Sequence, residues 1–445
     1  MGRLFGTDGI RGLANIDLTA ELALKTARAA TQVLSKHLYK KVNVIIGKDT
    51  RASCDMLECA LASGFSSAGA QVYLLGEIPT PAIAYLVGKY NADIGVMISA
   101  SHNPAEYNGI KLFNSKGCKL DDDIEDEIEK LILSSEFDIR EIPGRIHHVF
   151  SAVKDYTEYL IENIDAEYNP DLKVVVDCAN GAASRTAKIL LDTLKINAVI
   201  LNNKPDGFNI NENCGSVYIN ELSQHIKSHN ADIGIAFDGD ADRCLAIDKN
   251  GNVIDGDRII AVLALDLKEK GLLRGNKVAV TTMSNMGFFK FMESKDVGIV
   301  DTKVGDRYVL EEMIKQDIVI GGEQSGHIIL LDINSTGDGQ LTALKLLAAI
   351  SERNNNVECV SGIFKSFPQI VKNIKAGERE KAMLNEDHEF IKTVDKAKKK
   401  LEDNGRIIIR PSGTEPLIRI MVECEDKKQM VEIAEELATC FENSN

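Results

Sequence analysis

Three aspartates stand at alternate positions, Asp238, Asp240 and Asp242, directly after an apolar run that ends at Phe237. In an extended or loop segment this spacing lets the carboxylates converge on one hard cation, and oxygen ligands favour Mg²⁺ or Ca²⁺ over softer metals. The run begins like an EF-hand loop, but the later glycine and glutamate do not fall at the required offsets. The spacing therefore predicts a site of the Mg²⁺ type, with a solvated acidic turn as the alternative.

A second candidate for chemistry is Ser101, in the segment Ser99-Ala-Ser-His-Asn-Pro104 at the end of another apolar run. The sequence has no Gly-x-Ser-x-Gly elbow and no obvious triad order, so acyl transfer is a poor fit. A serine hydroxyl can still act as a nucleophile where neighbouring groups activate it. The alternative is that Ser101, Asn103 and Pro104 only form a turn or a helix cap.

A third candidate is the segment Arg410-Pro-Ser-Gly-Thr-Glu-Pro416. It offers a guanidinium, two hydroxyls and unhindered backbone N–H groups around Gly413, a set suited to holding a phosphate dianion. A plain Pro/Ser/Gly turn between strands is the alternative. Neither a G-x-x-x-x-G-K-[ST] phosphate loop nor a strand-linked G-x-G-x-x-G is present, so nucleotide-binding functions lose their usual support.

Composition limits the classes of protein that can carry these groups. The chain has 445 residues, 44% of them hydrophobic, which is enough for two to four domains with their own cores. A formal net charge of −15 argues against a nucleic-acid-binding surface, so an anionic substrate would need cations focused in one cleft. Nine cysteines without a C-x-x-C pair, and no apolar run of about 18 residues, indicate a reduced cytoplasmic protein without a membrane segment.

The elements that must position these residues form an internal repeat. In each of three copies an apolar strand begins near a lysine, an α/β stretch follows, and a second apolar strand runs into a polar loop. The paired strands are residues 41–47 and 91–97, 173–177 and 230–236, and 277–280 and 317–320. The loops that follow them are residues 99–104, 238–243 and 321–327. Because ligands in such folds lie beyond the carboxyl ends of strands, these three loops are expected to share one site.

Helical patterns such as residues 20–38 lie between the strands, as expected for helices that cover a mostly parallel sheet. After about Phe364 a charged helical run (382–401), two alternating strands (406–410 and 417–424) and a last helix (427–441) follow. The fold class is therefore α/β: three related α/β domains with mixed, mostly parallel sheets plus a C-terminal α+β domain, around a central cleft. The predicted domains are residues 1–153, 154–252, 253–366 and 367–445.

Five segments together resemble the ordered signature of the α-D-phosphohexomutase superfamily. They are Phe5-Gly-Thr-Asp-Gly-Ile-Arg-Gly12, residues 99–104, residues 238–243, Gly322-Glu-Gln-Ser-Gly-His327 and residues 410–416. The match spans almost the whole chain in order. The opening segment and the pairing of Ser-Ala-Ser-His with Gly-Glu-Gln-Ser-Gly-His resemble the branch acting on amino-sugar phosphates more than the glucose or mannose branches.

The resemblance implies a role for each matching position. Ser101 would carry the transferable phosphoryl group and join Asp238, Asp240 and Asp242 in holding Mg²⁺, with Arg11, His102 and Lys111 near that group. The remaining residues would bind the sugar and its idle phosphate: Glu323, Ser325, Lys303, Arg307, Arg410, Ser412, Gly413, Thr414 and Arg419. Within this resemblance, Arg243 adds a cation for the developing charge of phosphoryl transfer.

The implied reaction interconverts glucosamine 6-phosphate and glucosamine 1-phosphate through a 1,6-bisphosphate. The implied partner is thus a small sugar phosphate, with neither nucleic acid nor membrane, and a homodimer is left open as the oligomeric state. Three alternatives stay open: a glucose or mannose phosphate mutase of the same superfamily, a Mg²⁺-dependent sugar phosphatase, and a non-catalytic sugar-phosphate sensor.

Overall fold

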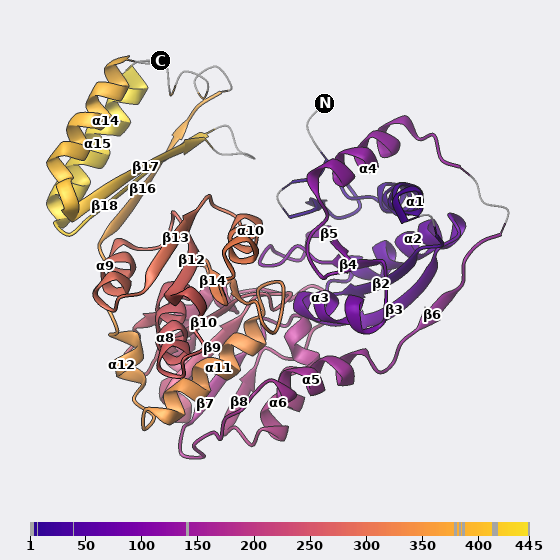
Figure 1. The fold of residues 1–445 in the computed structure, drawn as a ribbon, viewed down its shortest axis with the longest axis horizontal. Coiled ribbons are helices and arrows are strands. Elements are labelled where there is room, and N and C mark those ends of the chain that lie inside the picture. The colour runs from indigo at the N-terminus through magenta and orange to yellow at the C-terminus, as the bar shows by residue number, and fades with distance from the viewer. Residues whose placement is uncertain are drawn as a thin grey trace. The chain divides into compact units, whose positions relative to one another are not determined.

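A computed structural model describes the chain except for residues 1–3, 7, 39, 139–141, 378–380, 382–383, 385–387, 412–416 and 444–445. The chain divides into two compact units (Figure 1). Unit 1 is Met1–Met283 with Asp296–Ile363, and unit 2 is Ser284–Lys295 with Phe364–Asn445. Each unit is described by itself.

Unit 1 contains three sheets. The first has the strand order β1-β5-β4-β2-β3-β6, the second β11-β10-β9-β7-β8, and the third β13-β12-β14-β15. Their strands are β1 (Ile10–Leu13), β2 (Asn43–Lys48), β3 (Gln71–Glu77), β4 (Ile94–Ile98), β5 (Tyr107–Asn114), β6 (Ile146–His148), β7 (Val174–Asp177), β8 (Ala198–Leu201), β9 (Ile233–Phe237), β10 (Cys244–Asp248), β11 (Val253–Ile254), β12 (Lys277–Thr281), β13 (Gly298–Thr302), β14 (Ile320–Gly322) and β15 (Ile328–Leu330).

The strand pairings confirm the internal repeat. The two strands predicted for each copy pair in parallel with each other, as β2 with β4, β7 with β9, and β12 with β14. On one side a further parallel strand follows (β3, β8 or β13), and on the other an antiparallel strand (β5, β10 or β15). Each sheet is therefore mixed, as predicted. In each copy the candidate loop connects the second parallel strand to its antiparallel neighbour.

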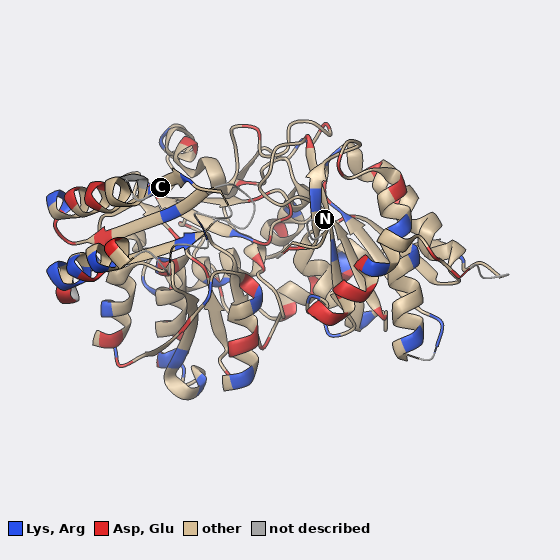
Figure 2. Ribbon diagram, turned by 90° about the horizontal axis from the view of Figure 1, so that it is seen from above, with Lys and Arg blue, Asp and Glu red and all other residues tan. Residues whose placement is uncertain are grey.

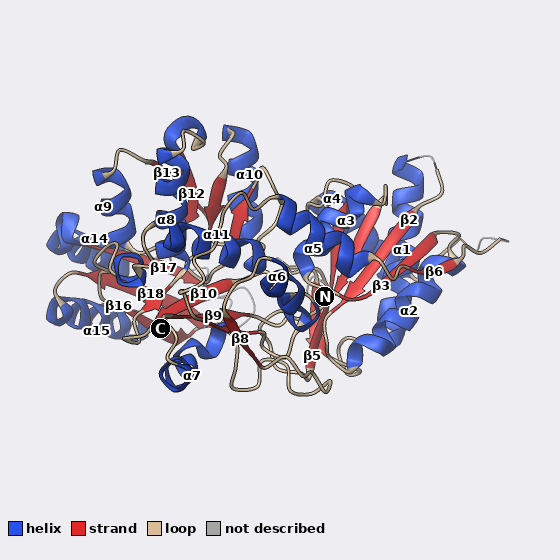
Figure 3. Ribbon diagram, turned by 90° about the horizontal axis from the view of Figure 1, so that it is seen from below, coloured by secondary structure: helices blue, strands red, loops and turns tan. Residues whose placement is uncertain are grey.

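Helices flank the strands of unit 1 (Figure 3). They are α1 (Ala20–Leu38), α2 (Ser53–Ser67), α3 (Thr80–Lys89), α4 (Asp122–Ser134), α5 (Ala152–Glu162), α6 (Ala187–Thr193), α7 (Leu222–His229), α8 (Gly256–Glu269), α10 (Asp306–Gln316), α11 (Gly339–Glu352) and α12 (Val357–Ser361). Helix α1 has the predicted bounds and buries one face, including Ala23, Ala27 and Val33. It packs closely on α2, because a Cβ atom at Gly64 would come 2.5 Å from the Leu24 carbonyl oxygen.

Unit 2 is built on one antiparallel sheet, β16-β18-β17. Its strands are β16 (Gln369–Lys375), β17 (Gly405–Pro411) and β18 (Leu417–Cys424), and its helices are α9 (Met286–Ser294), α14 (His388–Leu401) and α15 (Lys427–Asn443). The predicted alternating strands and terminal helix are present. Buried residues such as Phe390, Ile420 and Leu437 form its separate core, as expected of an α+β domain.

Acidic and basic residues are interspersed on the helices rather than segregated by sign (Figure 2). All nine cysteines are free thiols. Within the described residues, no helix is both long enough and apolar enough to cross a membrane.

Candidate active site

Ser101 lies three residues beyond the end of β4, almost fully buried at 1% exposure. Its backbone has a φ of 51°, a left-handed conformation that residues other than glycine rarely adopt. The hydroxyl donates a hydrogen bond of 2.6 Å to Oδ2 of Asp238, which directly follows β9. The ends of β4 and β9 thus bring the predicted nucleophile and the first acid together.

The three aspartates of the second loop converge as predicted. One carboxylate oxygen from each of Asp238, Asp240 and Asp242 lies within 4.8 Å of the others, and all three residues are buried. Among the described residues, Oδ1 of Asp240 and Oδ1 of Asp242 are buried without a hydrogen-bond partner. Three hard oxygen donors, two of them with an unused buried oxygen, fit a divalent cation such as Mg²⁺.

The pKa values of Asp238 and Asp242 in this loop are shifted in opposite directions. Burial and the neighbouring Asp242 and Asp240 charges raise the pKa of Asp238 well above its usual value, because three anions in a low-dielectric site repel one another. Burial acts the same way on Asp242, but Lys111 and His327 hold its pKa below the ordinary value. One side of the loop is therefore neutralised by protein cations, and the Asp238 side is not.

The predicted cations lie at the same place. Lys111 on β5 extends its Nζ to Oδ2 of Asp240 at 2.8 Å and to Oδ2 of Asp8 at 3.2 Å. Arg11 on β1 forms an ion pair with Asp8. Although burial opposes its charge, Asp240 and Asp8 raise the pKa of Lys111, so it stays a cation. The positions of Arg11 and Lys111 suit stabilisation of an anion next to Ser101.

His102 stands beside the nucleophile, with Nδ1 3.4 Å from the Ser101 hydroxyl oxygen. Burial and the nearby Arg243 and Arg11 lower its pKa to about 4. The ring is therefore neutral near pH 7. A neutral imidazole in this position can accept a proton from a hydroxyl group.

Residues of alternating charge form a closed cycle of ion pairs at the site. We call this cycle the charge ring. Its members, in spatial order, are Asp242, Lys111, Asp8, Lys119, Asp306 and His327, which returns to Asp242. The Lys119 Nζ lies 2.8 Å from Asp8 and 2.7 Å from Asp306. Burial disfavours the imidazolium of His327, but Asp242 and Asp306 raise its pKa to about 9. The ring joins segments of all three repeat copies through opposite charges.

The third loop meets the second directly. Arg243 and His327 form an isolated backbone bridge, and the backbone N–H of Glu323 donates to the His327 carbonyl oxygen. The charge of Glu323 contributes to the raised pKa of Arg243. The Ser325 hydroxyl faces Glu323 at 3.5 Å on the exposed side of this loop. Glu323 and Ser325 thus form a polar edge beside the acidic loop.

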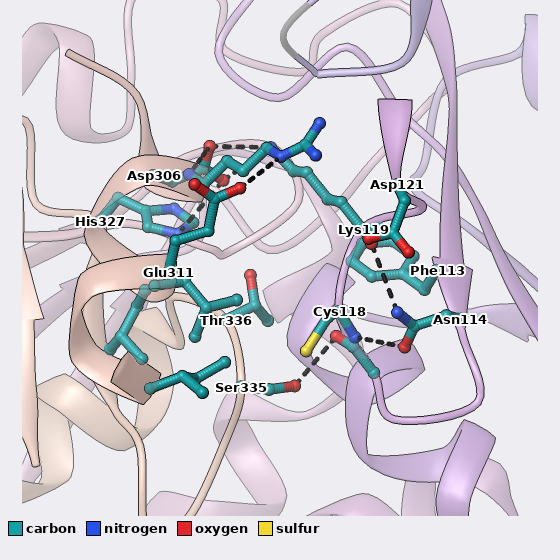
Figure 4. A pocket seen from close by; sticks show the side chains of 15 residues that line it. Phe113, Asn114, Cys118, Lys119, Asp121, Asp306, Glu311, His327, Ser335 and Thr336 are labelled. Carbon is teal, nitrogen blue, oxygen red and sulfur yellow. Dashed lines mark hydrogen bonds and ion pairs between the residues drawn. The ribbon is translucent and has the colours of Figure 1, made fainter. Parts of the chain in front are cut away.

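A cavity of about 210 Å³ adjoins the charge ring between the loop after β5 and the start of α10 (Figure 4). Lys119, Asp306 and His327 line one side of it. Arg307 also lines the cavity and is engaged by Asp122 and Glu311 rather than by the acidic loop. Lys303 is exposed, with its Nζ over the Tyr308 ring. The structure therefore does not bring Lys303 and Arg307 to Ser101.

In unit 2, Arg410 on β17 and Arg419 on β18 are directly opposite in the antiparallel register. Directly opposite side chains lie on the same face of the two strands, so both guanidinium groups are on one face of this sheet. Ser412, Gly413 and Thr414 lie outside the described residues.

Asp8, Lys119, Asp306, His327 and Thr80 were not identified as site residues from the sequence. Asp8 and His327 fall inside segments already singled out, and Asp306 directly precedes the predicted residue Arg307, so their positions were an available signal. Lys119 carries no such motif. Thr80 lies in the first turn of α3, and its hydroxyl donates to Oδ2 of Asp240 at 2.6 Å. Only the three-dimensional arrangement reveals this contact.

Comparison with known families matches the chain in four consecutive parts. Models of the phosphoglucomutase/phosphomannomutase family match residues 2–138 (alpha/beta/alpha domain I), 154–251 (domain II), 255–367 (domain III) and 366–439 (C-terminal domain). Together they cover most of the sequence in the family's own order.

Similar proteins point the same way. A phosphoglucosamine mutase of Caldicellulosiruptor bescii is 49% identical, with 100% of this chain and 99% of the relative covered. One from Clostridium acetobutylicum is 48% identical, covering 99% of each.

Solved structures share the fold. A Burkholderia thailandensis phosphoglucomutase/phosphomannomutase family protein has a TM-score of 0.82 at 22% identity, covering 99% of this chain and 97% of that one. An Aspergillus fumigatus N-acetylphosphoglucosamine mutase, solved with GlcNAc-6P and magnesium, has a TM-score of 0.71 at 18% identity, covering 99% and 96%. With four family domains in order and relatives nearly half identical along its whole length, the chain belongs to the phosphoglucomutase/phosphomannomutase family of phosphohexomutases, alongside the phosphoglucosamine mutases.

Proposed function

We propose that this chain interconverts glucosamine 6-phosphate and glucosamine 1-phosphate, with Ser101 as the carrier of the phosphoryl group. The observation that carries the proposal is the contact of the buried Ser101 hydroxyl, which donates to Asp238 at 2.6 Å. Asp238 belongs to the acidic loop, and Lys111 contacts Asp240 of the same loop. The phosphoglucosamine mutase relatives support the amino sugar as substrate. Such a product would feed the synthesis of nucleotide-activated N-acetylglucosamine.

Asp238, Asp240 and Asp242 would hold a Mg²⁺ ion together with an oxygen of phosphorylated Ser101. The unpartnered buried oxygens of Asp240 and Asp242 support this donor set. When bound, the ion supplies neutralisation of the charge that develops on the phosphoryl oxygens.

In the first half-reaction a sugar hydroxyl attacks the phosphorus of phosphoserine 101. The bond between phosphorus and the Ser101 oxygen breaks as the bond to the sugar oxygen forms, giving the 1,6-bisphosphate. Lys111, Arg11 and Arg243 stabilise the equatorial oxygens, since phosphoryl transfer depends mainly on alignment and charge stabilisation.

The sugar hydroxyl releases its proton as its bond to phosphorus forms, and the Ser101 oxygen takes up a proton as its bond to phosphorus breaks. His102, whose Nδ1 lies 3.4 Å from the serine oxygen, is placed to give or accept the proton at Ser101. The bisphosphate then reorients so that its other phosphate faces Ser101. The second half-reaction runs the same steps in reverse with that phosphate. Water must be excluded throughout, because hydrolysis of phosphoserine would convert the enzyme into a phosphatase.

The remaining predicted residues are proposed to grip the sugar phosphate. Glu323 and Ser325 would contact sugar hydroxyls or the amine, while Lys303 and Arg307 would approach the substrate only after a rearrangement of their present contacts. The idle phosphate would be held in unit 2 by a set of residues around the β17–β18 turn: Arg410, Ser412, Gly413, Thr414 and Arg419. The opposed arginines support this assignment.

We propose domain boundaries of 1–153, 154–252, 253–366 and 367–445. The division into two compact units supports a C-terminal domain that can move as a clamp on the idle phosphate. Free thiols at all nine cysteines support a reducing compartment, and we place the enzyme in the cytoplasm.

The test is turnover of glucosamine 6-phosphate with Mg²⁺ and a hexose 1,6-bisphosphate primer, followed by phosphorus NMR. We expect glucosamine 1-phosphate to accumulate, and Ser101→Ala to remove nearly all of it while the exposed control Ser134→Ala does not. Intact mass should show a fraction of the native protein heavier by one phosphate.

Each rival function predicts a different result in this assay. Stoichiometric release of inorganic phosphate would identify a phosphatase. Equal kcat/KM with glucose or mannose 6-phosphate would identify a broader hexomutase. Binding without any conversion would identify a sensor.

A further inference from the structure

The loop that carries Ser101 is held in a conformation that it would not adopt by itself. A φ of 51° at a serine costs about 1 kcal/mol or more, so the surroundings must impose it. The backbone N–H of Ser101 donates to the Ser99 hydroxyl at 2.9 Å, which fixes the peptide plane before Ser101. The plane after Ser101 must be fixed through its carbonyl group.

Arg51, just before α2, supplies one clamp on that carbonyl. Its side chain is fully buried and paired with the carboxylate of Asp49. The guanidinium Nη2 donates to the carbonyl oxygen of Ser101 at 3.1 Å and also to that of Asn103, while Nη1 lies 3.5 Å from the Ser99 hydroxyl. The planar fork of arginine therefore serves the nucleophile loop and not a surface charge.

Asn211 supplies a second clamp from a distant part of the chain. Its Nδ2 donates to the carbonyl oxygens of Ser101 and Asn103, both at 2.9 Å. The residue is buried, and its own backbone N–H is held by the Ala179 carbonyl. At Gly239, in the acidic loop, an added Cβ would come 2.6 Å from the Ser101 carbonyl oxygen. The first and second repeat copies thus enclose this one carbonyl.

We propose that Arg51 and Asn211 are positioning residues for phosphoryl transfer, which fix the Ser101 and Asn103 carbonyls so that the Ser101 hydroxyl faces Asp238. Apart from the contacts of Arg51 with Asp49 and Ser99, their described side-chain contacts are with the backbone of the loop, and not with the serine oxygen or the three carboxylates. This inference rests on the proposed transfer through Ser101. Because alignment dominates such a reaction, loss of a clamp should lower kcat, not substrate binding.

The experiment compares wild type, Asn211→Ala and Arg51→Lys in the glucosamine phosphate assay, with single-turnover transfer from phosphorylated enzyme as a second readout. Arg353→Lys and Asn163→Ala are matched controls, since both side chains donate to backbone carbonyls away from the site. We expect kcat and the single-turnover rate to fall about 10²-fold in the two clamp variants, with KM within about twofold. The controls should keep wild-type rates.

If the wild type were inactive in this assay, the proposed function itself would be wrong. If the wild type were active and the kcat of both clamp variants stayed within about threefold of it, only the positioning role would be overturned. A rise in KM with unchanged kcat would also overturn it, because that pattern indicates a binding contact. Since Arg51 is buried in its ion pair, its variant can fail to fold. Asn211→Ala keeps Arg51 in place and decides the outcome alone, with circular dichroism confirming the fold.

Discussion

Two groups of acids lie side by side in unit 1, one half-buried and one buried, and the protein treats them in different ways. Asp8 and Asp306 each lie between cations, and burial alone would raise the pKa of both. Lys111 and Lys119 lower the pKa of Asp8. Lys119 and His327 lower the pKa of Asp306. Asp238 faces two other acids, and its pKa is raised. Acids that the chain neutralises itself serve its architecture, whereas acids left facing each other are prepared for an external cation.

The largest effect should come from the three acids of the second loop, of which Asp240 also contacts Lys111. Asp240→Asn removes one charge and one oxygen donor, so we expect weaker Mg²⁺ binding and a loss of about 10³-fold in turnover at saturating Mg²⁺. Isothermal titration with Mg²⁺ and the mutase assay measure both. Asp248→Asn is the control, since Asp248 is also buried but is bound by Ser361 and Asn252. An unchanged Mg²⁺ titration of Asp240→Asn would place the metal elsewhere.

The acids neutralised by lysine should respond in stability. Lys119→Met leaves Asp8 and Asp306 without their shared cation, and we expect a loss of about 3 kcal/mol in the free energy of unfolding of unit 1. Urea unfolding provides the measurement. Lys345→Met is the matched control, because this lysine donates only to the Asn163 carbonyl. The double variant Lys119→Met/Asp306→Asn should be more stable than Lys119→Met, and a double variant that is less stable would contradict the ion-pair explanation.

A smaller effect of opposite sign is expected at Asp238. Without divalent cations, Asp238→Asn should raise the free energy of unfolding by about 1 kcal/mol, because it removes a buried charge that repels Asp240 and Asp242. Mg²⁺ should stabilise wild type and not the variant. Thermal unfolding in EDTA and in Mg²⁺ tests this. Destabilisation in EDTA as large as that of Asp306→Asn would erase the distinction between the two groups.

A pH-dependent effect concerns an acid of a third kind, Asp338, which caps α11 and accepts hydrogen bonds from Tyr156 and the Leu341 backbone. Burial raises its pKa to about 6 in the fold. The folded state therefore holds this proton more tightly than the unfolded state, so stability is lost as pH rises from about 4 through about 6. Relative to Asp338→Asn, wild type should lose roughly 1–2 kcal/mol over this window. Identical pH dependence of urea unfolding in both proteins would refute it.

The sequence predicted the strands, their grouping in three copies and the loops that meet, because apolar runs and polar loops are local signals. Helix α1 and the two strands around residue 413 were found for the same reason. The meeting of Ser101 with Asp238 was expected because both loops follow the carboxyl ends of strands. Since β4 and β9 belong to separate sheets, the contact itself depends on how the two sheets pack.

The neutralising contacts could not be predicted in this way. Lys119 is one of several lysines in its region, and only the approach of α10 gives it Asp306 as a partner. Arg51 belongs to none of the predicted motifs, and it is fully buried against the Ser101 loop. Both depend on side chains that meet across segments far apart in the sequence, and no local pattern records such meetings.

The charge ring has a consequence for inheritance. Every member of a closed alternating cycle has two neighbours of opposite sign, so a lineage that neutralises position 119 removes one counter-charge from each of two carboxylates, Asp8 and Asp306, in one step. A change at either carboxylate likewise leaves a lysine with an excess of positive charge. Substitutions around this cycle should therefore spread through descendants in compensating sets, and the charge at position 306 should track the charge at position 119 from one relative to the next.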